Sequence, residues 1–223
     1  MKLSILGIII SLIFSCNNKG EQQKYNLNPV ADVEETSYKK DQILSEAIDM
    51  KTLFNLSPLA VFNHTTDGLN FNEKKELFEK NKSASWEITE SKKYSMSLKS
   101  VSNDLINLYH LEKDSKTEVL LVAETSNQST SIMEIWNFVP ENKRFQKIKN
   151  PFYVNADDFV SIEDKLPSDY QAQFQYQFIE PNKVEVSLNT WMEKVFEQRE
   201  VINKILFEWD GNEFQKKISN IKS

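Results

Sequence analysis

Apolar positions follow two different periods along this chain, and the change comes near residue 85. Over residues 41–82 apolar side chains recur at the three-to-four-residue spacing of an amphipathic helix. Ser57-Pro58 is a suitable helix start, because Ser caps free N–H groups and Pro lacks one. Residues 70–73 (NFNE) have the form of a capping box, and Asn81 can close that helix. The pattern predicts a small helical element at 41–82.

Over residues 84–219 the apolar positions mostly alternate with period two, which is typical of half-buried strands. The runs lie at 86–88, 94–98, 105–111, 118–125, 132–139, 145–148, 170–178, 184–188, 201–209 and 214–218. We read them as eight or so strands, and Asp210-Gly211 before the last run is the strongest hairpin signal. Short turns favour antiparallel pairing, because parallel strands need crossovers of a dozen residues or more. Residues 192–199 fit either a strand extension or one helical turn.

These patterns predict an α+β fold that is mostly β. We expect an antiparallel meander sheet, either open or closed into a partial barrel, with the small N-terminal helical element packed on it. The aromatic residues of 170–178 alternate with glutamines, and we expect them to form the core face of a strand. Basic residues gather in one hairpin, where we expect them to protect an edge strand: Lys143, Arg144, Lys147 and Lys149.

The first sixteen residues, MKLSILGIIISLIFSC, form a separate pattern. Lys2 precedes an apolar run over 3–14, which is typical of a signal peptide and too short to cross a hydrocarbon layer of about 30 Å. Ile13-Phe14-Ser15-Cys16 then resembles the lipobox of bacterial lipoproteins. The resemblance implies that Cys16 becomes the first mature residue, carries the lipid, such as palmitate, and anchors the chain to a membrane.

We therefore expect a signal peptide at 1–15, a lipidated Cys16 followed by a flexible tether to residue 40, and a single domain at 41–223. The tether assignment follows from the lack of periodicity in 17–40. The lipobox resemblance implies a location in the bacterial cell envelope. Surface-displayed lipoproteins of some phyla carry an acid-rich tag after the Cys, but residues 17–21 hold one acid, which favours an outer-membrane anchor facing the periplasm.

Composition excludes several classes of function. The 223 residues include 27 Lys and Arg against 33 Asp and Glu, a formal net charge of −6, which opposes binding to nucleic acid. Four Gly form no phosphate-binding or nucleophile-elbow motif, and a single Cys excludes intrachain disulfides and Cys-rich zinc sites. The two His give no zinc-enzyme motif, and we expect no cofactor.

Each histidine lies near an acid. His64 and Asp67 fit either a general base with an orienting carboxylate or a turn after a helix, and we favour the turn because no nucleophile motif accompanies them. His110 and Glu112, two apart in a strand-like run, share one face of the strand. They could bind a metal or act as acid and base, but a solvated cross-strand polar pair is the favoured interpretation.

One acidic stretch has the oxygen ligands that Ca²⁺ prefers, although the EF-hand spacing and its Gly are missing. Its candidate ligands are Asp157, Asp158, Glu163 and Asp164. A solvated loop with a capping Asp is the favoured interpretation, so no metal is expected.

The leading functional hypothesis is a lipid-anchored envelope protein that binds or scaffolds rather than catalyses, with another envelope protein or a glycan as partner. One alternative is a cell-envelope hydrolase whose acid–base residues meet across the sheet: His110, Glu112 and an acid from Asp157 or Asp158. It predicts a concave pocket that contains His110 and a carboxylate with a perturbed pKa. Another is an inhibitor or immunity-type partner, which requires an exposed apolar patch of several hundred Å².

Overall fold

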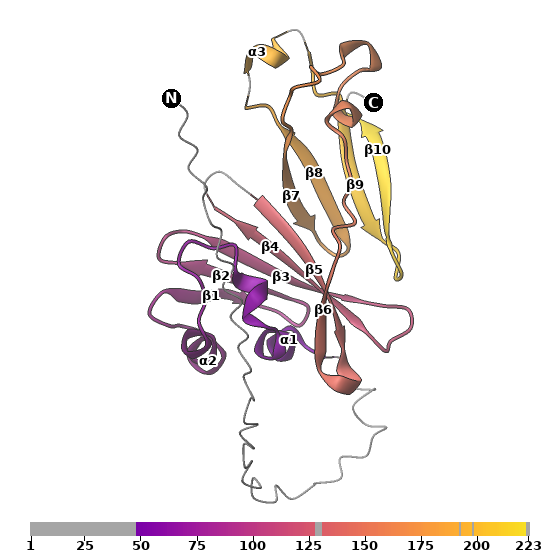
Figure 1. Ribbon diagram of the computed structural model, residues 1–223. Coiled ribbons are helices and arrows are strands. Elements are labelled where there is room, and N and C mark those ends of the chain that lie inside the picture. Colours follow the sequence, from indigo (N-terminus) through magenta and orange to yellow (C-terminus); the bar gives the residue numbers. More distant parts are fainter. Residues whose placement is uncertain (1–47, 128–130, 192, 198, 222–223) are drawn as a thin grey trace, which may run out of the picture. The chain divides into compact units, whose positions relative to one another are not determined.

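The computed structural model describes residues 48–127, 131–191, 193–197 and 199–221 (Figure 1). All of them belong to one structural unit. The expected signal peptide, Cys16 and the tether fall outside the described residues, so their assignment stays a prediction. None of the helices in the described part of the chain has the length and apolar character needed to span a bilayer.

Three short helices open the described chain: α1 (Met50–Leu56), η1 (Leu59–Phe62) and α2 (Phe71–Lys80). Asp49 caps α1 by accepting the Thr52 N–H at 2.7 Å. The expected capping box begins α2, since Asn70 accepts the Glu73 N–H at 3.0 Å and Glu73 reaches back to Asn70. Asn81 ends α2 with φ +60°, a left-handed conformation that Asn tolerates better than most residues.

Six strands then form an antiparallel meander in sequence order. They are β1 (Trp86–Ser91), β2 (Ser95–Ser100), β3 (Leu105–Glu112), β4 (Val119–Ser126), β5 (Ser131–Val139) and β6 (Arg144–Ile148). The short helix η2 (Pro140–Asn142) makes the last turn. The basic hairpin supplies β6, which is an edge strand of this sheet, as expected.

A connecting segment with two prolines and the short helices η3 (Ala156–Phe159) and η4 (Ile162–Asp164) leads to a second antiparallel sheet. This sheet contains β7 (Gln173–Ile179), β8 (Lys183–Asn189), β9 (Asn203–Trp209) and β10 (Phe214–Asn220), in the order β10-β9-β8-β7. Residues 193–196 form one helical turn, α3 (Glu193–Phe196), which resolves the ambiguity there. Asp210 and Gly211 turn β9 into β10, as the sequence predicts.

The prediction of a mostly β, antiparallel fold with a small N-terminal helical element is confirmed. The ten described strands form two sheets and no closed barrel. Where one meander was expected, the prolines at 151 and 167 lie in a segment that breaks it between β6 and β7, because Pro cannot donate to a strand ladder.

Each face of the six-stranded sheet carries its own core. Leu53, Phe62 and Leu77 of the helices pack on one face, against Trp86 and its neighbours. Residues of β4 and β5 on the other face pack against β7–β9 and the 152–160 segment. Alternate side chains of a strand point to opposite faces, so β4 and β5 contribute to both cores.

Tryptophans mostly occupy the core. Trp86, Trp136 and Trp209 are at most 8% exposed. Trp191 differs, with 48% exposure, and lies just before α3. The aromatic face of β7 turns inward while its glutamines are exposed, which confirms the alternation seen in 170–178.

Candidate functional site

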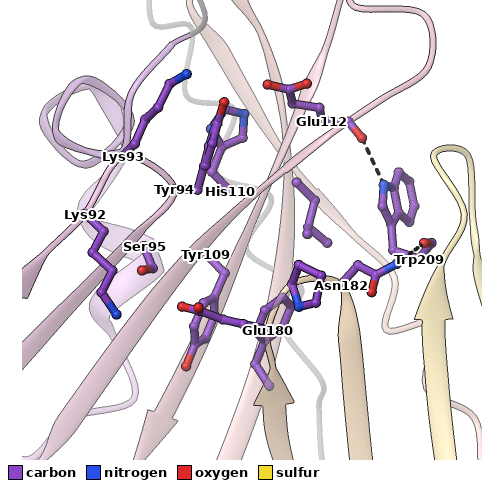
Figure 2. Close-up of a pocket in the computed structure, with 13 residues that line it drawn as sticks. Lys92, Lys93, Tyr94, Ser95, Tyr109, His110, Glu112, Glu180, Asn182 and Trp209 are labelled. Atoms are coloured by element: carbon purple, nitrogen blue, oxygen red, sulfur yellow. Dashed lines mark hydrogen bonds between the residues drawn. The ribbon is translucent and has the colours of Figure 1, made fainter.

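A cleft of about 510 Å³ lies where two strand turns and the ends of two further strands come together (Figure 2). The β1–β2 turn and the end of β3 supply one side, and the β7–β8 turn and the end of β9 supply the other. The thirteen lining residues are Lys92, Lys93, Tyr94, Ser95, Tyr109, His110, Leu111, Glu112, Phe178, Glu180, Pro181, Asn182 and Trp209. Both sheets therefore contribute to this cleft.

His110 is the most unusual group in the cleft. It is 6% exposed, and neither ring nitrogen has a hydrogen-bond partner among the described residues. The Tyr94 ring lies over it, with the two ring centroids 5.2 Å apart. Burial lowers the pKa of His110, with Lys93 acting in the same direction and Glu112 and Asp49 opposing it. The imidazole is therefore neutral at neutral pH, with one N–H donor and one bare acceptor nitrogen.

Charged side chains of both signs surround this ring. Lys93 and Glu112 lie on either side of the Tyr94–His110 pair in Figure 2. The Lys93 ammonium is 4.7 Å from the Tyr94 ring centroid, within the range of a cation–π contact. Lys92 forms a salt bridge of 2.9 Å to Glu90, next to the cleft.

One flank of the cleft is closed by Trp209 of β9. Its indole Nε1 donates to the backbone carbonyl of Glu112 at 2.9 Å, and its backbone pairs with Asn182 in the β7–β8 turn. Just beyond, Asp114 N–H donates to the Gly211 carbonyl at 3.0 Å. Gly211 has φ +103°, and a Cβ there would collide with the Asp114 carboxylate, so only Gly suits this tip.

The other flank is closed by Tyr109 and Phe178, whose rings stack with centroids 3.9 Å apart. Behind them the buried Glu124 accepts the backbone N–H of Phe178 at 3.1 Å. Burial raises the pKa of Glu124, while the bonds from Phe178 and Tyr109 oppose that rise. Burial also raises the pKa of Tyr109, strengthened by the neighbouring Glu124 and Glu180. This flank joins the two sheets through side chains rather than through a shared ladder.

His110 and Glu112 thus line one cleft, as their spacing of two residues allows. Burial of His110 differs from the solvated pair that the sequence favoured. The ring has no hydrogen bond to a carboxylate in the described structure, so it lacks the orienting partner of a general base. Ser95, at the start of β2, also lines the cleft, but it is buried and pairs with Tyr109 in the ladder.

His64 and Asp67 are not brought together as a pair. His64 Nε2 lies 2.6 Å from Oε1 of Glu134 on β5, 70 residues away. The Asp67 carboxylate instead accepts two hydrogen bonds from Ser102, one from its backbone N–H at 3.1 Å and one from its hydroxyl at 2.8 Å. His64 lies in a turn after η1, the favoured interpretation, and its contact with Glu134 ties that turn to the sheet.

The four acidic candidates lie in the segment that connects the two sheets, where two of them make contacts through their carboxylates. Asp158 binds the Lys216 ammonium at 2.7 Å, and Asp157 accepts the Leu166 N–H at 3.2 Å. Glu163 and Asp164 belong to the short helix η4. Among the described residues no three His, Cys, Asp or Glu side chains gather closely enough to hold a metal ion.

Several lining residues had no signal in the sequence. Phe178, Glu180 and Trp209 reach the cleft only because the two sheets meet there, about 70 to 100 positions beyond His110. The sequence Pro181-Asn182 is typical of a turn, but nothing local shows what that turn faces. Tyr94 and Lys93 reach it because the β1–β2 turn lies beside the end of β3.

Comparison with known proteins gives little more. No family model matches the chain, and no curated protein matches it either. Among solved structures, it is similar to a domain of an uncharacterized protein from Porphyromonas gingivalis W83. That similarity has 10% identity and a TM-score of 0.49, and it covers 75% of this chain and 96% of that one.

Proposed function

We propose that this protein is a lipid-anchored, non-enzymatic binding module of the bacterial cell envelope, with the cleft around His110 as its ligand site. The signal-like N-terminus and the lipobox resemblance at Cys16 support the anchor and an outer-membrane location facing the periplasm. The observation that carries the binding role is the cleft itself: a 510 Å³ hollow with a buried, unpartnered imidazole in its wall.

The small number of polar groups in the cleft and the missing hydrogen-bond partner of His110 favour a binding site over a catalytic one. Ligand sites are mainly apolar with a few convergent polar groups, and this cleft has that character. A hydrolytic site needs a base within hydrogen-bond reach of a nucleophile or water and held by a third group. His110 has no such partner in the described structure.

The anchor is tested by growing cells with radiolabelled palmitate. We expect label on the wild-type chain and none on Cys16→Ala, because that thiol is the acceptor in the lipobox interpretation. Ser15→Thr serves as the matched control and keeps the label. Absence of label from the wild type, or equal label on Cys16→Ala, rejects the anchor.

The binding role is tested with a small-molecule fragment screen on the full chain in detergent, read by thermal shift. We expect hits that raise the melting temperature of the wild type and lose this effect in Phe178→Ala, which removes one wall. Tyr153→Ala, an exposed aromatic residue outside the cleft, is the control. If no fragment distinguishes these variants, the cleft is not the binding site.

An envelope hydrolase is the second candidate, because His110 and Glu112 line the same cleft. It predicts turnover of an ester such as p-nitrophenyl acetate that is lost in His110→Asn and retained in His64→Asn. Equal turnover in the two variants removes this candidate.

A further inference from the structure

The outer face of the second sheet carries a row of amide side chains along β7 and β8. The side chains of β7 that point away from the core are all glutamines, and all of them are exposed. Gln173 pairs with Asn189 and Gln175 with Ser187, so these side chains share one face of the two adjacent strands (Figure 1). We call this row the amide strip: Gln173, Gln175, Gln177, Ser187 and Asn189.

The surroundings of the amide strip are electrically neutral. Its three glutamine side chains form no hydrogen bond within the described residues, so their donors and acceptors face solvent. The charged groups of β8 on this face are paired with β9, Glu185 with Lys204 and Lys183 with Glu208. A charged ligand would therefore find no unpaired partner here. Hydroxyl groups suit the strip better, because an amide can both donate to and accept from them.

Protection of a strand edge does not explain these glutamines. β7 is the last strand in the order of its sheet, but its outer edge is covered by the first sheet. The Ser131 hydroxyl donates to the Tyr176 carbonyl at 2.6 Å, and Glu124 accepts the Phe178 N–H at 3.1 Å. Edges that need protection usually carry charged side chains or Pro, whereas this row is uncharged.

An exposed indole lies at one end of the amide strip. Three tryptophans belong to the two cores, but Trp191 belongs to neither core of the described chain and is 48% exposed. It follows Asn189 by two residues, and its Nε1 donates to the backbone carbonyl of Gln171 at 3.3 Å. This bond fixes the ring beside the start of β7. A fixed indole offers a large apolar surface at low entropy cost.

We propose that the amide strip and Trp191 bind a neutral glycan chain in an extended conformation. A sugar ring has hydroxyl groups at its rim and C–H groups on its faces, which match amides and an indole respectively. Residues 171–177 span about 20 Å at about 3.3 Å per residue, enough for several linked sugar rings. None of these residues lines the His110 cleft, so the inference adds a second ligand to the proposed binding role.

The test is titration calorimetry on the full chain in a detergent without a sugar headgroup. The probes are three neutral hexasaccharides, namely cellohexaose, chitohexaose and xylohexaose. Hexagalacturonate and the glucosamine hexamer are the anionic and cationic comparisons. We expect at least one neutral hexasaccharide to bind, and at least five-fold more tightly than either charged hexamer, because the strip offers hydrogen bonds and no unpaired charge.

Variants of exposed side chains locate the site. Trp191→Ala should weaken the affinity at least ten-fold, whereas Trp191→Phe keeps a flat ring and should retain most of it. Gln173→Ala/Gln175→Ala should weaken it about five-fold, since each amide contributes a modest hydrogen bond.

Two matched controls lie outside the amide strip. Tyr153→Ala removes another exposed aromatic ring, and Gln146→Ala removes an exposed amide on β6. Both should bind within two-fold of the wild type. A thermal melt of each variant checks that it is folded.

The inference is overturned if none of the neutral hexasaccharides binds, or if Trp191→Ala binds them like the wild type. Tighter binding of a charged hexamer also overturns it. If no glycan binds, self-association of the wild type that Trp191→Ala abolishes would assign the strip to a second copy of the chain. The proposed function of the cleft is decided separately, by the fragment screen and its dependence on Phe178.

Discussion

Glu124 and Glu134 lie on neighbouring strands, on opposite faces of the six-stranded sheet, and both are more than nine-tenths buried. On the helix-covered face, Glu134 contacts the Lys147 ammonium, His64 and the Trp136 indole N–H. On the face toward the second sheet, Glu124 has the backbone N–H of Phe178 and the neighbouring Tyr109, and no cation from the described part of the chain.

The two environments shift the carboxyl groups in opposite directions. Burial acts to raise the pKa of both groups. For Glu134 the bonds and charges of Lys147 and His64 outweigh burial, so its pKa lies below the ordinary value. For Glu124 burial prevails, and its pKa lies above that value. Two equally buried carboxyl groups can therefore differ in charge. A nearby cation favours the ionised form, as at Glu134, whereas burial without such a contact favours the neutral form, as at Glu124.

Lys74 differs from both glutamates, because its ammonium is buried among the helices and has no carboxylate partner within the described residues. Its ammonium donates to the carbonyls of Asn55, at 3.1 Å, and Ser57. Burial lowers its pKa from 10.5 to about 8. Between these values the unfolded chain holds a proton that the folded chain has lost, so stability rises with pH.

We therefore expect the free energy of unfolding of the wild type to rise relative to that of Lys74→Met between pH 8 and 10.5. The rise is up to about 3 kcal/mol, at about 1.36 kcal/mol for each unit of pKa difference. Urea unfolding at pH 8, 9 and 10 measures the change. Lys75→Met, an exposed neighbour on the same helix, should follow the wild type. A flat difference between wild type and Lys74→Met would show that Lys74 keeps its ordinary pKa.

Glu134→Ala should give the next largest effect, a loss of about 2 kcal/mol in the free energy of unfolding. The change leaves the buried Trp136 N–H without its acceptor and removes the contact that ties His64 to the sheet. Chemical denaturation measures it, with the exposed Glu141→Ala as control. A loss as small as that of the control would mean that Glu134 is not a structural centre.

Glu124→Gln tests the opposite face, with an expected effect of about 1 kcal/mol. Gln keeps an acceptor for the Phe178 N–H but never ionises. Glu124 contributes its full stabilisation below the pKa that it has in the unfolded chain. That stabilisation is lost as pH rises through its higher pKa in the folded chain. The variant should therefore become more stable relative to wild type as pH rises from 4.5 to 7, in urea unfolding at each pH.

Glu134→Gln is the matched comparison, with the reverse sign. The contribution of Glu134 is present above pH 4.5 and is lost as pH falls through its lowered folded pKa. As pH falls, the deficit of Glu134→Gln in free energy of unfolding relative to the wild type should shrink. The gain of Glu124→Gln relative to the wild type should shrink over the same change. Two variants with the same sign of pH dependence would contradict the comparison of the faces.

His64→Asn should have the smallest effect, about 0.5 kcal/mol, because the His64 side chain is 36% exposed and exposed contacts contribute little. A thermal scan measures it, with Asn63→Ala as control. A loss as large as that of Glu134→Ala would show that the His64 contact carries most of the stabilisation of that site.

Local signals in the sequence predicted the elements well, and long-range contacts explain what they missed. The capping box at Asn70 and the Asp210-Gly211 turn depend on residues within four positions, so the sequence alone identifies them. The alternation of β3 likewise put His110 and Glu112 on one face. The split into two sheets had only an indirect sign in the prolines at 151 and 167.

The candidate site was predictable only in part for the same reason. The sequence names His110 and Glu112, but not that Phe178 and Trp209 would line the same cleft, since that depends on how the sheets meet. The partner of His64 was equally hidden, because Glu134 lies in a run of apolar residues and no local pattern connects the two. Its burial as a charged residue makes sense only with Lys147 and His64 in place.

The tip of the last hairpin, where Gly211 meets Asp114, has a consequence for how the cleft can move. The Trp209–Glu112 bond lies beside this tip, and the Tyr109–Phe178 stack stands on the opposite flank. The walls are thus pinned on two sides, and the hollow cannot widen without breaking one of these contacts. A ligand of the right size would bind a preformed site, so the protein would lose little conformational entropy on binding.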